Sequence, residues 1–268
     1  MTALAALATL SRRRFALTAR TPRELLVPLL TPVLFAVVIA PALKQALGGF
    51  RGGGIDYESF VAIATVGLLI PLNTMFAGIG VIVDRESGAR RELLAAPVPR
   101  PLLVLGNLAV ALSVTALQLT ALIAAAVLRG IHFNASATGV VWALAAALLF
   151  AAGMYGVAET LANRIPRQEE YIAVVPAVAI VPWFFAGSLF PLTALPGPLA
   201  AFAKVLPLTH ALALMRYGLL DHSGAGLHDI WGMSSTTLMA ALSLAVVGLF
   251  AAAFTAVSIA VFRRAAMR

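Results

Sequence analysis

Long stretches without charge are the feature that most constrains this chain. Residues 59–83 and 101–128 contain no Asp, Glu, Lys or Arg. Each stretch is long enough to cross the roughly 30 Å hydrocarbon core of a membrane as one helix. The chain is 61% hydrophobic and 11% charged, whereas soluble domains carry about a quarter charged residues. This pattern predicts an all-α polytopic membrane protein, because helices satisfy their own backbone polar groups in lipid.

Apolar runs of this kind predict six transmembrane helices, with no room for a separate soluble domain. The whole chain, residues 1–268, is therefore expected to form one transmembrane domain. The predicted spans are 25–46, 58–83, 101–128, 137–161, 171–190 and 234–262.

Two further segments are predicted to lie at the membrane surfaces. Residues 1–23 place five arginines among leucines, which favours an uncleaved amphipathic helix in the headgroup layer. A signal peptide is the alternative, but the basic cluster starts late and no clear cleavage site follows. Residues 191–229, between the fifth and sixth spans, contain four prolines with Lys204, His210 and Arg216. They predict short external helices that dip into the surface, because a cation at mid-bilayer is costly.

The basic residues indicate the topology. Cytoplasmic loops are enriched in Lys and Arg. If both termini are cytoplasmic, fourteen of the 19 basic residues lie inside, and those outside are Lys44, Arg51, Arg129, Lys204 and Arg216. This arrangement predicts a multi-pass protein with both termini cytoplasmic, and it assigns the charge of +8 to topology rather than to nucleic-acid binding. The expected location is a bacterial plasma (inner) membrane.

Residues 84–100 form a charged island between the second and third predicted spans. Glu86 precedes Arg90 by one helical turn, a spacing that supports a helix. Pro97 and Pro99 would end that helix. One interpretation is a solvated loop that only separates two spans. The other is a docking element for a soluble partner.

The chain lacks the motifs of several enzyme and carrier classes. No Gly-Lys dipeptide occurs, so the phosphate-binding loop of ATPases is missing. There are no cysteines, and the four histidines lack metal-ligand spacing. Apart from Glu58 at the very start of the span 58–83, Glu159 is the one acid within a predicted span, and it is expected to pair with Arg164 or Arg167 at the interface. The sequence therefore predicts no catalytic residue, no metal site and no cofactor bound by this chain.

Two motifs resemble the membrane subunits of type-2 ATP-binding-cassette exporters, particularly the daunorubicin-resistance-type drug and lipid permeases. The first is Asp84-Arg85-Glu86-Ser87-Gly88 followed by 91–100. It is similar to the Arg-Glu-x-Gly loop of that family. The second runs from Gly187 through Pro191 and Leu206-Pro207-Leu208-Thr209-His210 to Arg216. It is similar to the external re-entrant region of the family.

The resemblance implies a division of labour between subunits. It implies that residues 85–96 form a coupling helix that docks on a separate ATPase subunit, which binds ATP and magnesium. It also implies a second permease copy, identical or homologous. The implied coupling residues are Arg85, Glu86, Gly88, Arg90, Arg91 and Glu92. The implied re-entrant motif comprises Phe190, Pro191, Pro196 and Pro207.

A substrate path is predicted from adaptable apolar side chains in the second and fifth spans. Its candidates are Asn73, Met75, Phe76, Trp183, Phe184 and Phe185. The alternative is that these side chains pack against lipid or neighbouring helices. The expected cargo is a hydrophobic or amphiphilic drug-like or lipid-like compound, which would give the exporter a part in multidrug resistance or lipid transport. Three alternatives stay open: export of a lipid-linked saccharide, a non-transporting membrane scaffold, and an ion-coupled carrier.

Overall fold

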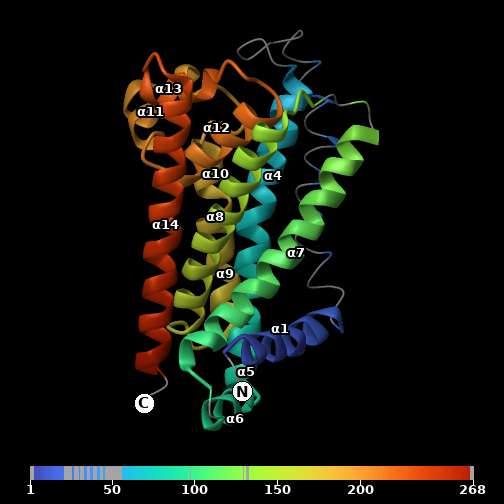
Figure 1. Cartoon of the computed structure of the whole chain (residues 1–268), viewed down its shortest axis with the longest axis vertical. Coiled ribbons are helices and arrows are strands. Elements are labelled where there is room, and N and C mark those ends of the chain that lie inside the picture. Colours follow the sequence, from blue (N-terminus) through green and yellow to red (C-terminus); the bar gives the residue numbers. More distant parts are fainter. Residues whose placement is uncertain are drawn as a thin grey trace.

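Four long helices form the body of the molecule (Figure 1). The computed structural model describes residues 3–20, 56–96, 98–128, 130 and 133–265, with single positions or pairs at 26, 30, 33–34, 37–38, 41–42 and 45. Among these residues, four helical runs are long and apolar enough to span a membrane. They are Tyr57–Glu86, α7 (Arg100–Leu128), α8 (Ala137–Ala162) and α14 (Thr236–Ala265). The chain is therefore a multi-pass membrane protein.

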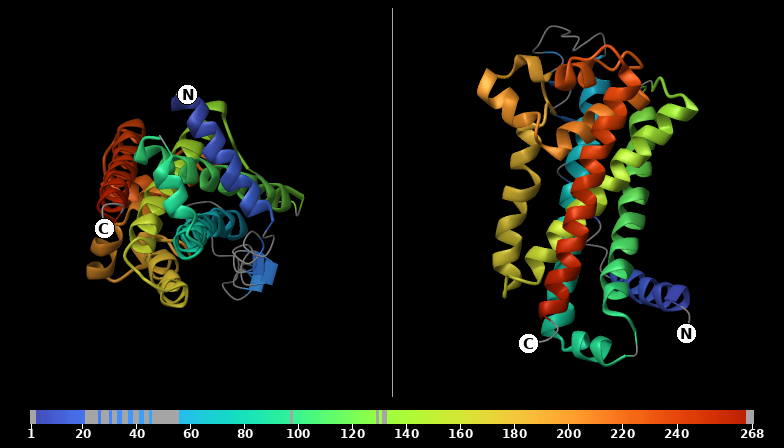
Figure 2. Two further views of the ribbon diagram at one scale, coloured as in Figure 1. Left: turned by 90° about the horizontal axis from the view of Figure 1, so that it is seen from below. Right: turned by 60° about the vertical axis from the view of Figure 1, so that its left-hand side comes forward.

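Shorter helices close the two ends of this bundle, as Figure 1 shows. The run Tyr57–Glu86 consists of α4 (Tyr57–Ala77) and α5 (Ile79–Glu86). At the end of the bundle called here the α6 end, α5 and α6 (Ala89–Ala95) meet α1 (Ala3–Ala19), which lies across the bundle rather than along it. At the opposite, α13 end lie α11 (Gly197–Ala203) and α13 (Ala225–Trp231). Figure 2 shows α1 projecting sideways from the α6 end.

Helix α8 packs against α14 and α12 through glycines that allow close backbone approach. A Cβ atom at Gly156 would lie 2.6 Å from the carbonyl carbon of Phe254 on α14. Gly139 and Gly218 bring α8 and α12 (Pro207–Leu219) into similarly close contact. Small residues serve this purpose in membrane helices, where packing rather than water exclusion drives association.

We expect Gly156→Ala to lower the thermal midpoint of unfolding. The added methyl group must push α14 away, and overpacking of this kind costs about 1–3 kcal/mol. Gly248→Ala is the matched control, because the nearest atom to its added Cβ is 3.8 Å away. Thermal unfolding in detergent compares the two. An equal midpoint for both variants would contradict the close packing of α8 on α14.

Buried hydrogen bonds also connect the spans. The Asn73 amide on α4 donates to the Thr115 hydroxyl on α7 at 2.6 Å. The Trp183 indole donates to the carbonyl of Ala64 at 2.7 Å. Such bonds satisfy polar groups that lipid cannot. They hold α4 at the centre, where nearly all of its residues are buried.

The predicted fifth span, 171–190, is not one helix: α9 (Gln168–Ala179) and α10 (Val181–Phe185) form it, and the helix ends before Ala186. Pro176 and Pro182 lack amide donors, and Gly187 adopts a φ of 72° that ends the helical path.

The predicted span 25–46 lies largely outside the described residues. The predicted helix of the charged island is two helices, because Gly88 has a φ of 80°.

The region 191–229 is helical, as predicted. It contains η2 (Leu192–Ala194), α11, α12 and α13. Helices α11 and α12 are bent by 80° at a short break, the geometry of a broken span or a re-entrant loop. Counting this pair as one span gives five candidate spans rather than four among the described residues.

Candidate coupling site at the α6 end

Arg14 fastens α1 to the bundle. Its guanidinium donates to the carbonyls of Gly80 at 3.2 Å and Ala77 at 3.4 Å. The same group lies 3.4 Å from the Asp84 carboxylate, and the neighbouring Arg13 reaches that carboxylate at 3.3 Å. This position of the Arg14 side chain requires a glycine at residue 80, because a Cβ atom there would overlap the guanidinium. Helix α1 is thus attached to the end of α4 and to α5 by hydrogen bonds and ion pairs.

The junction between α4 and α5 is held from its other side by Tyr171. The hydroxyl of Tyr171, on α9, donates to the carbonyl of Met75 at 2.7 Å. It can approach because Gly78 has no side chain at the junction. A phenol from α9 and a guanidinium from α1 therefore hold the last turn of α4. These contacts join residues about 60 to 96 positions apart, so no local sequence pattern indicated them.

Arg85 connects α5 to the turn between α8 and α9. Its guanidinium donates to the carbonyls of Ala162 at 3.0 Å, Ile165 at 2.9 Å and Pro166 at 2.7 Å. Carbonyls at the end of α8 carry the negative end of the helix dipole, which favours a cation. The structure therefore places Arg85 on the inner side of residues 85–96, the segment predicted to couple to an ATPase and called here the coupling segment.

We expect Arg85→Gln to loosen this attachment. Glutamine cannot span three carbonyls, so the turn 162–166 and helix α6 should exchange amide hydrogens at least severalfold faster, since hydrogen bonds from charged groups contribute about 1.5–3 kcal/mol each. Hydrogen–deuterium exchange with mass spectrometry measures this change. Arg100→Gln, an exposed arginine at the start of α7, is the control. Unchanged exchange in both variants would show that Arg85 does not fasten α5.

Arg90 also points inward, toward a buried acid. Its guanidinium stacks over the ring of Phe262 at 4.9 Å, and it lines a small cavity of about 30 Å³ together with Glu159 and Asp84. Burial lowers the pKa of Arg90, the charge of Glu159 raises it, and Arg85 lowers it. Arginine remains charged at any physiological pH. The inner face of α6 therefore carries a cation held against the bundle.

Glu159 is not paired with Arg164 or Arg167, contrary to expectation. It is 1% exposed, and it accepts hydrogen bonds from the Tyr155 hydroxyl at 2.7 Å and the Asn163 amide at 3.1 Å. Arg167 instead lies 3.5 Å from Glu170. The i, i+4 spacing of Tyr155, Glu159 and Asn163 on one helix face was the signal that could have indicated this arrangement.

The remaining charges of the coupling segment face away from the protein. Glu86, Arg91 and Glu92 are exposed, and their side chains make no hydrogen bond or ion pair with another described residue. Gly88 also has open space around it, with nothing within 4 Å of an added Cβ. The predicted coupling residues thus separate into two sets. Arg85 and Arg90 fasten the segment, whereas Glu86, Gly88, Arg91 and Glu92 form a free surface.

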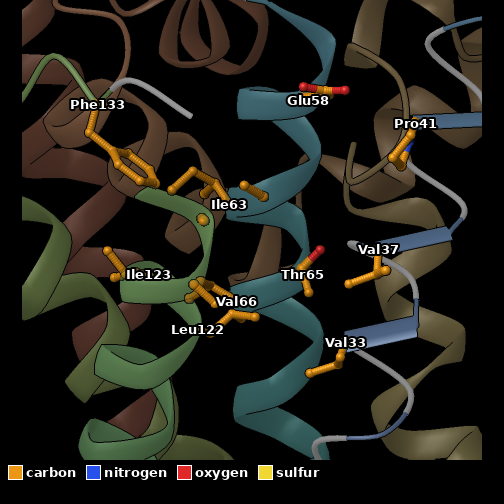
Figure 3. Close-up of a pocket in the computed structure, with 13 residues that line it drawn as sticks. Val33, Val37, Pro41, Glu58, Ile63, Thr65, Val66, Leu122, Ile123 and Phe133 are labelled. Atoms are coloured by element: carbon orange, nitrogen blue, oxygen red, sulfur yellow. The ribbon is translucent and has the colours of Figure 1, made fainter. Parts of the chain in front are cut away.

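A groove opens between α4 and α7, in the half of the bundle nearer the α13 end. Ile63, Val66, Leu122, Ile123 and Phe133 line it, and Val33 and Val37 also belong to its lining (Figure 3). Its cavity is about 90 Å³. The carboxylate of Glu58 lies at one end of the wall, and Thr65 is a second polar residue in an otherwise apolar lining (Figure 3). The chemistry of the wall suits a hydrocarbon chain.

The structure does not gather the predicted substrate-path residues in that groove. Asn73, Met75 and Trp183 are buried between helices, and Phe76 is half-buried. Phe184 is 55% exposed on the outer surface, and Phe185 packs edge-on against Phe202 with ring centroids 5.9 Å apart.

The prolines of the re-entrant motif begin its short helices. Pro191 and Pro196 precede η2 and α11, and Pro207 is the first residue of α12. A proline is favoured there because the first helical amides have no acceptor in any case. Phe190 is partly exposed at 41%. The motif thus defines where the chain turns at the α13 end.

The sequence of this chain is similar to those of known transport proteins. The profile of a family described as ABC-2 type transporter matches residues 5–220. Nodulation protein J of Sinorhizobium fredii is 28% identical over 178 residues, which are 66% of this chain and 67% of that protein. The putative transport permease ycf38 of Porphyra purpurea is 23% identical over 209 residues, which are 78% of this chain and 72% of that protein.

Proposed function

Because the chain belongs to the ABC-2 type transporter family as a membrane permease subunit, we propose that it forms the membrane half of an ATP-driven exporter. A separate ATP-binding-cassette subunit would bind ATP and magnesium and hydrolyse the nucleotide. Permeases of this family work with such a partner in general. Two permeases, identical or homologous, would combine with two ATPases.

The observation that carries this proposal is the two-sided construction of the coupling segment. Arg85 and Arg90 fix it to the bundle, while Glu86, Arg91 and Glu92 face outward without partners among the described residues. A surface of alternating charge specifies a partner and its register more than it adds affinity. Since α5 is continuous with the central helix α4 through a clamped junction, a displacement of the ATPase would be transmitted to the spans.

The topology of the proposal follows the basic residues. The α6 end would be cytoplasmic and would hold both termini, and the α13 end would face outward from a bacterial inner membrane. Helix α1 carries Arg12, Arg13, Arg14 and Arg20. It lies across the bundle axis (Figure 2), as a helix in the headgroup layer must. The six spans of the proposed domain, residues 1–268, would include 25–46.

The proposed cargo is a hydrophobic or amphiphilic compound, drug-like or lipid-like. Support comes from the groove between α4 and α7, because its mostly apolar lining suits such a compound. A lipid-linked saccharide is the second candidate cargo. A non-transporting scaffold is disfavoured because family membership is that of a transporter.

Reconstitution tests the proposal. The permease and its co-purifying ATPase would be placed in vesicles with a fluorescent lipid or daunorubicin, and movement across the bilayer would be followed after ATP addition. We expect ATP-dependent movement that disappears when the lysine of the ATPase phosphate-binding loop is replaced. A complex that hydrolyses ATP but moves neither compound would contradict this cargo class. A permease that never retains an ATPase would contradict the exporter itself.

A further inference from the structure

A second cavity lies at the α13 end, distant from the coupling segment. It is about 170 Å³, well above the ~15 Å³ that one water molecule needs. The start of α4, the turn after α10, and helices α12 and α13 enclose it. Its charged and polar lining includes Thr193, Thr209, Arg216, Asp221 and Asp229. The predicted motif explains the turns of this region but not this cluster of charges.

Arg216 is a buried cation with one donor left over. Arg216 is 8% exposed, and its guanidinium stacks on the ring of Phe60, with Cζ 3.4 Å from the ring centroid. One terminal nitrogen donates to the carbonyl of Gly187 at 2.9 Å, and the other donates to Ser188 at 3.1 Å. Gly187 itself has a φ of 72°. The Nε–H of Arg216 is buried and has no hydrogen-bond partner among the described residues.

Asp229 supplies an opposite charge in the same cavity. It is half-buried, and its side chain makes no hydrogen bond or ion pair with another described residue. Burial raises the pKa of its carboxyl, whereas the charges of Lys204, His228 and Arg216 lower it. Asp221, by contrast, is occupied, because its carboxylate accepts the amides of Ser223 at 2.8 Å and Ala225 at 3.0 Å.

The cavity therefore has a cation and an anion that attract each other without touching. A purely anionic ligand would satisfy Arg216 but would meet the repulsion of Asp229. A purely cationic ligand would be attracted by Asp229 but repelled by Arg216. A molecule that presents an oxyanion to one side and an ammonium group to the other satisfies both.

We propose that this cavity binds a zwitterion, with its oxyanion beside the Arg216 guanidinium and its ammonium group on the Asp229 carboxylate, the two charged side chains that line it. Ethanolamine phosphate, free or as the headgroup of phosphatidylethanolamine, has this chemistry. The ammonium must be able to donate a hydrogen bond, so a quaternary ammonium is a poorer ligand. The site needs neither ATP nor the ATPase, so it stands or falls independently of the proposed export function.

Native mass spectrometry of the full-length permease in detergent tests the proposal. Phosphatidylethanolamine, phosphatidylcholine and phosphatidylglycerol with matched acyl chains would be titrated separately. We expect phosphatidylethanolamine to bind at least tenfold more tightly than the other two. Glycerophosphoethanolamine, the soluble headgroup, should compete with it. Competition shows that the headgroup rather than the acyl chains is recognised.

Asp229→Asn is the decisive variant, because it is nearly isosteric and removes no hydrogen bond to a described residue. It should lose the tenfold preference while keeping its thermal midpoint. Glu169→Gln, an exposed acid on α9 at the other end of the bundle, is the control and should keep the preference. Arg216→Gln should also lose it, but the Asp229 variant carries the test if that protein does not fold. Equal binding of the three lipids, failure of the soluble headgroup to compete, or an unchanged preference in Asp229→Asn would overturn the proposal.

Discussion

Reversing the charge of Glu92 to lysine is expected to reduce the amount of ATPase retained by the purified permease at least tenfold. Glu92 is exposed on α6 and contacts no described residue through a hydrogen bond or ion pair. Its loss therefore leaves the folded permease unchanged. In the complex, a lysine would face a surface shaped for a carboxylate, and like charges in contact cost several kcal/mol. Each 1.4 kcal/mol corresponds to a factor of ten in affinity.

The matched control for this reversal is Glu169→Lys. Glu169 is also exposed, on the first turn of α9 rather than on α6. Retention of the ATPase is measured by quantitative mass spectrometry after purification in mild detergent, and the thermal midpoint is measured on the same samples. Arg90→Glu gives a useful contrast, because Arg90 packs on Phe262. We expect that variant to lose stability as well as partner binding. Equal retention in Glu92→Lys and Glu169→Lys would refute a docking role for α6.

The second large effect is expected at the seat of α1. Arg14→Ala removes two hydrogen bonds to carbonyls and the ion pair with Asp84. Breaking a buried pair by deleting one partner costs about 3–5 kcal/mol. The Asp84 side chain is 13% exposed and keeps Arg13 as a partner, so we expect about 3 kcal/mol here. Arg12→Ala, which removes an exposed neighbour on the same helix, should have little effect.

A double-mutant cycle makes this prediction specific. Gly80→Ala places a methyl group where the Arg14 guanidinium lies, so it should displace Arg14 and destabilise the protein by itself. Once Arg14 is alanine, the three atoms nearest to the added methyl group are gone, since all three belong to the Arg14 guanidinium. The double variant should therefore be no less stable than Arg14→Ala alone, a strong departure from additivity. Unfolding in detergent measures all four proteins. Additive losses would show that Arg14 and Gly80 act separately.

The length of the runs without charged residues predicted the spans well, because a single apolar segment satisfies its backbone hydrogen bonds in lipid by forming a helix. The predictions 101–128, 137–161 and 234–262 agree with α7, α8 and α14 to within a few residues at each end. The prediction 58–83 joined what the structure divides into α4 and α5. The resemblance to type-2 permeases is confirmed by the family profile.

The predictions were weakest where tertiary contacts override local pattern. Glu86 and Arg90 have helical spacing, but the left-handed backbone of Gly88 separates them into different helices. Arg85 and Arg90 looked like surface charges, yet each finds carbonyl or aromatic partners far away in the sequence. Arg216 was expected at the surface because a cation in lipid is costly. The structure buries it in protein instead, with three carbonyls and Phe60 as its partners.

The natural absence of cysteine permits the most direct test of the coupling segment. The chain contains no Cys, so Ala95→Cys on the exposed side of α6 creates a unique thiol for a photo-cross-linker in native membranes. Ser223→Cys, exposed at the α13 end, is the control. We expect the α6 thiol to capture a protein with a Gly-Lys-Ser/Thr phosphate-binding loop, and the Ser223 thiol to capture none. Capture of the ATPase from the α13 end, or no ATPase at α6, would contradict the account.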